Sequence, residues 1–152
     1  MKYFAYGSNM DPLQMKEANV PFSERWRAVL TGHVLRFNKV ATRHDAQEGE
    51  GKGNIVEKEN EIVEGVLYKI YSSDLRGLDE KEGYPKHYNR IFVKVKLDDH
   101  HTKVRAVTYV AQPSMTRDGL KPTREYLSHY LAAREILSES YYQKLLAVET
   151  LD

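Results

Sequence analysis

The order of local patterns along the chain constrains its fold more than any other feature. Residues 88–97 alternate, with apolar side chains on one face and basic ones on the other, which is typical of a half-buried strand. Further strands are predicted at residues 3–6, 27–40, 62–70 and 104–111, and the second is long and either bent or divided at Thr31-Gly32. Two helices are predicted at residues 122–137 and 138–148. Strands followed by helices indicate an α+β protein with a mixed or antiparallel sheet.

Shorter segments join these elements. Asp11-Pro12 has the pattern of an N-cap followed by proline in the first turn, which predicts a helix to about Ala18. A second short helix is predicted from Ser72 or Ser73 to Gly83. Residues 44–61 are rich in Glu, Gly and Lys and predict a surface loop around a short apolar piece at 54–56, with a partner-binding loop as the alternative. Residues 98–101 predict a polar turn.

Composition argues against several classes of protein. A length of 152 residues predicts one domain over residues 1–152. The 23 Lys and Arg nearly balance the 22 Asp and Glu, which argues against a nucleic-acid partner. The chain has no cysteine, which excludes disulfides and thiol nucleophiles, and its six histidines lack metal-ligand spacing. No apolar run is long enough for a membrane span or a signal peptide, so we expect a cytoplasmic protein without a membrane partner.

The segment Tyr6-Gly7-Ser8-Asn9-Met10 is the first candidate site, between a predicted strand and a predicted helix. A turn of this kind can direct successive backbone N–H groups into one concavity that suits an anion. The same residue types also make an ordinary tight turn. The segment is neither a Gly-x-Ser-x-Gly nucleophile elbow nor a Walker phosphate-binding loop.

Glu82 is the second candidate. In the predicted helix, Leu75 and Leu78 define the buried stripe and Glu82 falls on it, whereas Glu80 and Lys81 point elsewhere. Burial and the negative end of the helix both disfavour the charged carboxylate and raise its pKa toward neutral pH. A general base requires such a pKa. The alternative is a glutamate that reaches solvent at the end of the helix.

In their order along the chain, these segments resemble the gamma-glutamylcyclotransferase-like family. Residues 3–10 are similar to its opening strand, which ends in Tyr-Gly-Ser-Asn followed by Leu or Met, and residues 64–68 to its Gly-hydrophobic strand. Residues 78–83 match its Leu-Asp-x-x-Glu-Gly helix end, and residues 88–90 match its Tyr-x-Arg. Tyr109 resembles the tyrosine of the next strand. The closing helices resemble the branch that contains the glutathione-pathway and butirosin-biosynthesis cyclotransferases.

The resemblance implies a small mixed β-barrel surrounded by helices. It also implies a small-molecule partner, a gamma-glutamyl amide or peptide, from which 5-oxoproline and a free amine are released without a metal or other cofactor. Glu82 would be the catalytic acid and base. The substrate-binding residues would be Tyr6, Gly7, Ser8, Asn9, Met10, Tyr88 and Tyr109. Residues 112–117 match no motif of the family, so the leaving amine stays open.

Two other functions stay open on the sequence. One is a non-catalytic protein that binds gamma-glutamyl groups. The other is a hydrolase or acyltransferase with Ser8 as nucleophile, for which no histidine has a diagnostic position. Both a monomer and a homodimer are compatible with the sequence.

Overall fold

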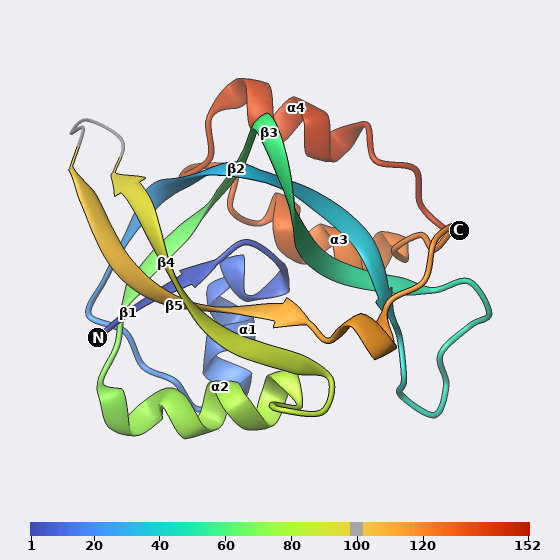
Figure 1. Ribbon diagram of the computed structural model, residues 1–152, viewed down its shortest axis with the longest axis horizontal. Coiled ribbons are helices and arrows are strands. Elements are labelled where there is room, and N and C mark those ends of the chain that lie inside the picture. Colours follow the sequence, from blue (N-terminus) through green and yellow to red (C-terminus); the bar gives the residue numbers. More distant parts are fainter. Residues whose placement is uncertain (98–101) are drawn as a thin grey trace.

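Within the described residues, five strands close into a mixed barrel in the order β1-β3-β2-β4-β5 (Figure 1). The computed structural model describes residues 1–97 and 102–152, so the turn predicted at residues 98–101 lies outside the described residues. The strands are β1 (Lys2–Ala5), β2 (Glu24–Val40), β3 (Gly51–Lys69), β4 (Tyr88–Leu97) and β5 (Lys103–Ala111). Neighbours are antiparallel except β1 and β5, whose parallel pairing joins Tyr3 to Val107. The predicted α+β barrel is confirmed.

The longest ladder joins β2 to β3, with register shifts after Thr31 and after Arg36. The first shift shows that residues 27–40 belong to one bent strand. The predicted loop at residues 44–61 is wrong in its second half, because β3 already begins at Gly51. Two features of this segment make the strand hard to predict from the sequence. Residues 56–60 are exposed and mostly charged. Gly51, which is unfavourable in strands in general, is required here because a Cβ atom would lie 2.1 Å from the carbonyl oxygen of Phe37.

In the part of the chain that the structure describes, four short helices surround the barrel: α1 (Pro12–Glu17), α2 (Leu75–Glu82), α3 (Arg124–Leu131) and α4 (Glu139–Leu146). The Asp11 side chain accepts from the N–H of Leu13 (3.0 Å), so the predicted N-cap of α1 is confirmed. The predicted serine cap of α2 is wrong: Ser72–Asp74 form a 3-10 turn (η2) without a side-chain cap. The predicted end of α2 is confirmed, since Gly83 has a left-handed conformation at φ 64°.

The helix predicted at residues 122–137 is shorter than expected. It ends at Leu131, and the next residues form tight turns in which the N–H of Ala133 bonds to Tyr130 and that of Ile136 bonds to Ala133. These turns allow the chain to reverse before Ser138 caps α4. In Figure 1, α3 and α4 lie on one side of the barrel and α2 lies on the other.

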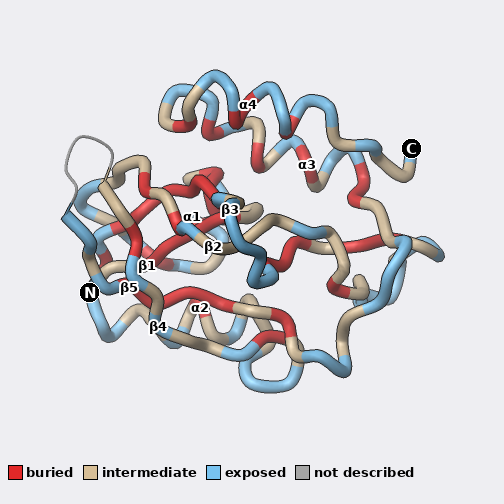
Figure 2. Tube along the Cα trace, turned by 45° about the horizontal axis from the view of Figure 1, so that its top comes forward, coloured by how far each residue is buried: buried red, intermediate tan, exposed pale blue. Residues whose placement is uncertain are grey.

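Two clusters of buried residues form the core. One consists almost entirely of strand residues, including Phe4, Leu67 and Val95. In the other, strand residues meet helical residues such as Leu78 and Tyr130. Figure 2 shows buried stretches in the strands and on the sides of α3 and α4 that face the barrel. Within the described residues, no helix has both the length and the apolar character that crossing a bilayer requires.

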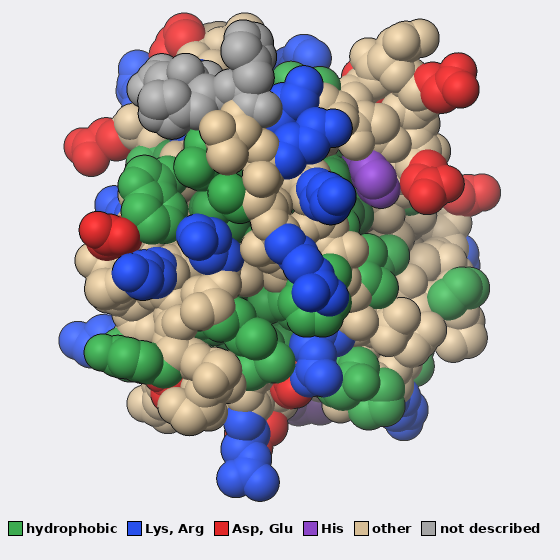
Figure 3. All heavy atoms as spheres, turned by 60° about the vertical axis from the view of Figure 1, so that its left-hand side comes forward, with side chains coloured by type: hydrophobic (Ala, Val, Ile, Leu, Met, Phe, Trp, Pro, Cys, Tyr) green, Lys and Arg blue, Asp and Glu red, His purple; other side chains and the backbone are tan. Residues whose placement is uncertain are grey.

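One face of the molecule carries many basic side chains although the formal net charge is only +1. Figure 3 shows Lys and Arg side chains gathered, among apolar ones, on one face of the molecule. On the β4–β5 hairpin, Lys94, Lys103 and Arg105 are exposed, and the Arg105 guanidinium lies 3.8 Å from the ring centre of Phe92.

Candidate active site

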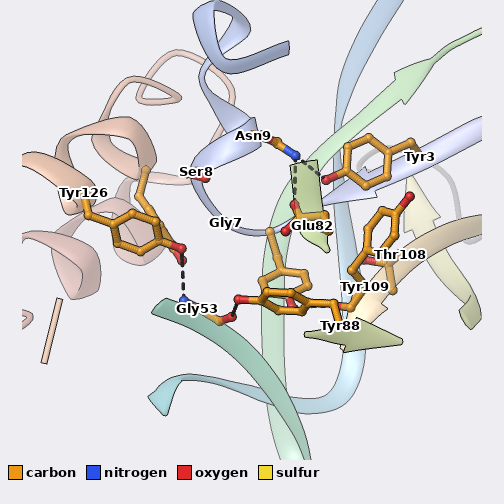
Figure 4. A pocket seen from close by; sticks show the side chains of 12 residues that line it. Tyr3, Gly7, Ser8, Asn9, Gly53, Glu82, Tyr88, Thr108, Tyr109 and Tyr126 are labelled. Atoms are coloured by element: carbon orange, nitrogen blue, oxygen red, sulfur yellow. Dashed lines mark hydrogen bonds between the residues drawn. The ribbon is translucent and has the colours of Figure 1, made fainter. Parts of the chain in front are cut away.

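A narrow chamber opens where β1 leads into the 3-10 turn Ser8–Met10 (η1) (Figure 4). Its walls come from the first strand and turn and from β3, α2, β4, β5 and α3. The lining residues are Tyr3, Tyr6, Gly7, Ser8, Asn9, Gly53, Glu82, Tyr88, Thr108, Tyr109, Tyr126 and Tyr130. The structure therefore brings together every candidate site residue from the sequence except Met10.

Met10 lies in the core and not in the chamber. Its side chain is fully buried, and its N–H donates to the carbonyl of Gly7 (2.9 Å) to close the 3-10 turn. The Tyr68 hydroxyl holds this turn from β3 by donating to the carbonyls of Asn9 (2.7 Å) and Met10 (3.1 Å). In the described part of the chain, no acceptor meets the N–H groups of Ser8 and Asn9. These two donors are available to a ligand.

Gly7 is favoured mainly by a close approach. Its φ of −116° is negative, so the left-handed region does not explain the glycine. A Cβ atom at Gly7 would lie 3.1 Å from the hydroxyl oxygen of Tyr130. A larger side chain would therefore push against α3 at the wall of the chamber.

Glu82 occupies the last turn of α2, on the same side of the helix as the buried Leu78. Its Oε1 accepts from the Nδ2 of Asn9 at 3.1 Å. Burial raises the pKa of Glu82 to about 7, although Lys81, Lys39 and Lys52 and the Asn9 hydrogen bond act in the opposite direction. A carboxylate with this pKa takes up and releases protons near neutral pH.

Asn9 is held in one orientation by Lys81. Lys81 was expected to point away from the buried stripe of α2, but its long side chain reaches η1 and α1, where Nζ donates to Asn9 Oδ1 (2.6 Å) and Gln14 Oε1 (2.8 Å). The Asn9 Nδ2 is then directed to Glu82 and to the hydroxyl of Tyr3 (2.9 Å). This network positions the carboxylate of Glu82.

The predicted tyrosines line the chamber with hydroxyls that already have acceptors. Tyr88 donates to the carbonyl of Gly53 (2.7 Å), and Tyr6 donates to the carbonyl of Tyr109 (2.5 Å). Tyr109 donates to Asp79 Oδ1 (2.6 Å). Burial raises the pKa of all three hydroxyls above the usual value for tyrosine. They shape the chamber as neutral groups.

Part of the wall was not predicted from the sequence, including Gly53, Tyr126 and Tyr130. Gly53 donates its N–H to the hydroxyl of Tyr126 (3.0 Å), which also lies 3.1 Å from that of Tyr130. Both tyrosines lie on α3, four residues apart and so on one face of the helix. The sequence did contain a signal for them. Two tyrosines four residues apart on a buried face need hydrogen-bond partners for both hydroxyl groups.

A wider vestibule lies outside the chamber and shares Ser8, Glu82, Tyr88 and Tyr126 with it. Its further lining includes basic and histidine side chains, namely Lys39, Arg43, Lys52, Lys81, His87 and His129. Across residues 1–97 and 102–152, no three His, Asp or Glu side chains are grouped so that they could hold a metal ion.

The fold and part of the sequence are similar to known proteins. A structure titled "Gamma-glutamyl cyclotransferase" matches with a TM-score of 0.83 and 25% identity over 100% of this chain and 89% of that chain. The crystal structure of YkqA from Bacillus subtilis matches with a TM-score of 0.81 and 28% identity over 99% of this chain and 55% of that chain. In sequence, "Putative gamma-glutamylcyclotransferase YkqA" of Bacillus subtilis (strain 168) is 36% identical over 108 residues.

The sequence match to YkqA covers 66% of this chain and 35% of that relative, so this chain corresponds to only part of the longer protein. The family model of the AIG2-like family matches residues 62–145, which include Glu82, Tyr88, Tyr109, Tyr126 and Tyr130. That match extends over more than half of the chain, and the barrel has the gamma-glutamyl cyclotransferase fold. The chain belongs to the AIG2-like family.

Proposed function

We propose that this protein is a gamma-glutamyl cyclotransferase, which releases 5-oxoproline and a free amine from a gamma-glutamyl amide. The observation that carries the proposal is Glu82, a carboxylate with a pKa of about 7 beside the free N–H groups of Ser8 and Asn9. The fold and the names of the similar proteins support the same activity.

In this reaction the substrate supplies its own nucleophile. The alpha-amine of the gamma-glutamyl group attacks the gamma-carbonyl carbon and closes a five-membered ring, and the bond to the leaving amine then breaks. Glu82 takes one proton from the alpha-ammonium group before attack and a second from the same nitrogen as the ring closes. It passes each to the leaving nitrogen, which departs as an ammonium group, so the carboxylate ends as it began. The chamber holds the flexible chain bent, with the two reacting atoms close together.

The tetrahedral intermediate carries a negative oxygen that needs fixed donors. The N–H groups of Ser8 and Asn9 are donors of this kind, because Tyr68 and the Met10–Gly7 hydrogen bond fix the turn before substrate binds. These N–H groups bind either this oxygen or the alpha-carboxylate of the substrate. In either role, the turn acts through its backbone N–H groups.

The direct test is Glu82→Gln, assayed by release of 5-oxoproline from gamma-glutamyl dipeptides. Loss of a positioned acid and base should lower kcat by about 10²–10⁴ and leave binding largely intact. The matched control is Glu80→Gln, because Glu80 is an exposed carboxylate on the same helix. Near-normal turnover by Glu82→Gln would contradict the proposed mechanism.

One observation favours a second candidate, a hydrolase with Ser8 as nucleophile. The His129 Nδ1 lies 2.8 Å from Asp11 Oδ2, and His129 lines the vestibule together with Ser8. However, within the described residues no hydrogen bond joins Ser8 to His129. A hydrolase would release glutamate, whereas the cyclotransferase releases 5-oxoproline and requires a free alpha-amine.

Two variants of the turn separate these candidates. If the turn acts through its backbone, Ser8→Ala should retain most activity, and Gly7→Val should lose most of it because the added methyl groups meet Tyr130. N-acetylation of the substrate should abolish turnover by the cyclotransferase. Complete inactivation by Ser8→Ala, with glutamate as the product of the wild type, would favour the hydrolase.

A further inference from the structure

Four cationic side chains meet on the β4–β5 hairpin, on the outer surface of the barrel. The strand register places Lys94 opposite Arg105 and Lys96 opposite Lys103. Since Lys94 and Lys96 are two residues apart on one strand, both pairs lie on the same face of the hairpin. Like charges directly opposite each other on neighbouring strands are destabilising. These four residues, named the cationic ladder below, therefore favour an anionic partner.

The ladder lacks a compensating carboxylate in the described part of the chain. Across residues 1–97 and 102–152, no Asp or Glu oxygen lies within 4.0 Å of any ammonium or guanidinium nitrogen of the ladder. Asp98 and Asp99 are close in the sequence but lie outside the described residues, and two carboxylates offset only half of the four charges. A surplus of positive charge therefore belongs to this hairpin.

An exposed aromatic ring stands beside the ladder. Phe92 precedes Lys94 by two residues, so its side chain lies on the same face of β4, and it is 55% exposed. The Arg105 guanidinium lies 3.8 Å from the centre of its ring. A single exposed aromatic ring is common on protein surfaces. Here the ring and the four cations offer apolar and positively charged groups to the same partner.

The surface of an anionic membrane matches both kinds of group. Its negative headgroups attract clusters of Lys and Arg, and apolar side chains insert at the boundary with the acyl chains. A small free anion would pair with the ladder and leave the ring in water. A single-stranded nucleic acid would stack its bases on the ring, but Arg105 already covers one face of Phe92.

We propose that the cationic ladder and Phe92 form a docking surface for an anionic membrane, with the four cations at the headgroups and the ring inserted between them. The tip of the hairpin lies at the upper left of Figure 1 and comes forward in Figure 3. Lys94 lies about 20 Å along β4 from Tyr88 at the wall of the chamber, at the usual rise per residue. Docking is therefore separate from the candidate active site and independent of the proposed function.

The test is cosedimentation of the full chain with phosphatidylcholine vesicles, with and without about 30% phosphatidylserine. The wild type should bind the phosphatidylserine vesicles at least about tenfold more tightly, and added salt should weaken this binding. Each charge removed near an anionic surface weakens binding by about fivefold, so Lys94→Gln/Arg105→Gln should lose about 25-fold. Phe92→Ala should lose about fivefold or more, because no ring is left to insert.

A second pair and a matched control complete the set of variants. Lys96→Gln/Lys103→Gln should lose as much as the first double variant, so the test does not depend on the folding of one protein. Lys16→Gln/Lys58→Gln removes two exposed lysines from α1 and from the exposed part of β3, with the same change in net charge. This control should bind within about twofold of the wild type if position on the surface decides the affinity.

Several results would overturn the docking surface. Equal binding of the wild type to both kinds of vesicle, or equal losses in the control and the ladder variants, would show that the ladder recognises nothing. Unchanged binding by Phe92→Ala would show that the ring does not insert. Binding to poly(U) RNA but not to vesicles, lost in the ladder variants, would identify a nucleic-acid surface in place of a membrane surface.

Discussion

At the scale of single residues, Glu82 connects reactivity to stability. Its pKa of about 7 lies above the ordinary 4.5. Between pH 4.5 and pH 7, Glu82 therefore keeps its proton in the folded protein, whereas in the unfolded chain it has released it. Stability from this group is present below pH 4.5 and is lost as the pH rises through 7. A group prepared for proton transfer at neutral pH thereby destabilises the fold there.

We therefore expect Glu82→Gln to gain stability relative to the wild type as the pH rises. Between pH 4.5 and pH 8 the relative gain should be on the order of 3 kcal/mol, because glutamine does not ionise. Urea unfolding at the two pH values measures the gain, with Glu80→Gln as the control. An equal difference in stability from the wild type at both pH values would contradict the raised pKa.

The pH dependence of activity tests the role of Lys81. The base form of Glu82 is required, so kcat/KM should rise with pH through a midpoint near 7. Lys81→Met removes a nearby positive charge that lowers the pKa of Glu82, and the midpoint should move to higher pH. A merely structural role for Lys81 would lower the rate without moving the midpoint.

At the scale of elements, the packing of α3 against β3 leaves room only for glycine at position 53. A Cβ atom at this position would lie 2.0 Å from the hydroxyl oxygen of Tyr130 on α3. Gly53→Ala should therefore cost about 1–3 kcal/mol, the usual cost of overpacking, and should reduce activity by moving α3. Thermal unfolding and the 5-oxoproline assay measure the two effects.

Removing the obstructing atom gives a rescue for this variant. Tyr130→Phe deletes the hydroxyl, so Gly53→Ala/Tyr130→Phe should be more stable than the sum of the two single changes predicts. Strict additivity would show that the contact between Gly53 and Tyr130 does not limit the packing of β3 against α3.

The elements also show what the sequence could predict. Local chemistry was sufficient at Asp11 and Gly83, where one cap or one left-handed residue fixes the end of a helix. It failed at residues 51–61, because the strand consists of glycines required by close approaches and of charged residues on an exposed ladder. Burial in that segment is decided by contacts with distant residues, and no local pattern encodes them.

The same contrast between local patterns and long-range contacts applies to the candidate site. Glu82 and the residues 6–9 were found because each belongs to one short segment that has its own pattern. The wall at Tyr126 and the neighbouring vestibule lysines Lys39 and Lys52 were not predicted, because they depend on how α3 packs on the barrel and on the register of β2 with β3. Register is a property of two strands together and is absent from either segment alone.

At the scale of the whole molecule, the closed barrel predicts one cooperative unit. The helices pack against the same cluster of buried residues as the strands, so residues 1–152 should unfold in a single transition. Tryptophan fluorescence and far-UV circular dichroism should report the same midpoint in urea, since Trp26 lies in β2 and the helices dominate the dichroism. Separate midpoints would contradict a single domain.

The parallel pairing of Tyr3 with Val107 has a consequence for the order of folding. The chamber takes its walls from residues as far apart as Tyr3 and Tyr130, so a chain emerging from the ribosome has no chamber until α3 has been made. Contacts between such distant segments form slowly. Recovery of activity during refolding should therefore coincide with the slowest step in barrel closure. The appearance of turnover would then report when the fold is complete.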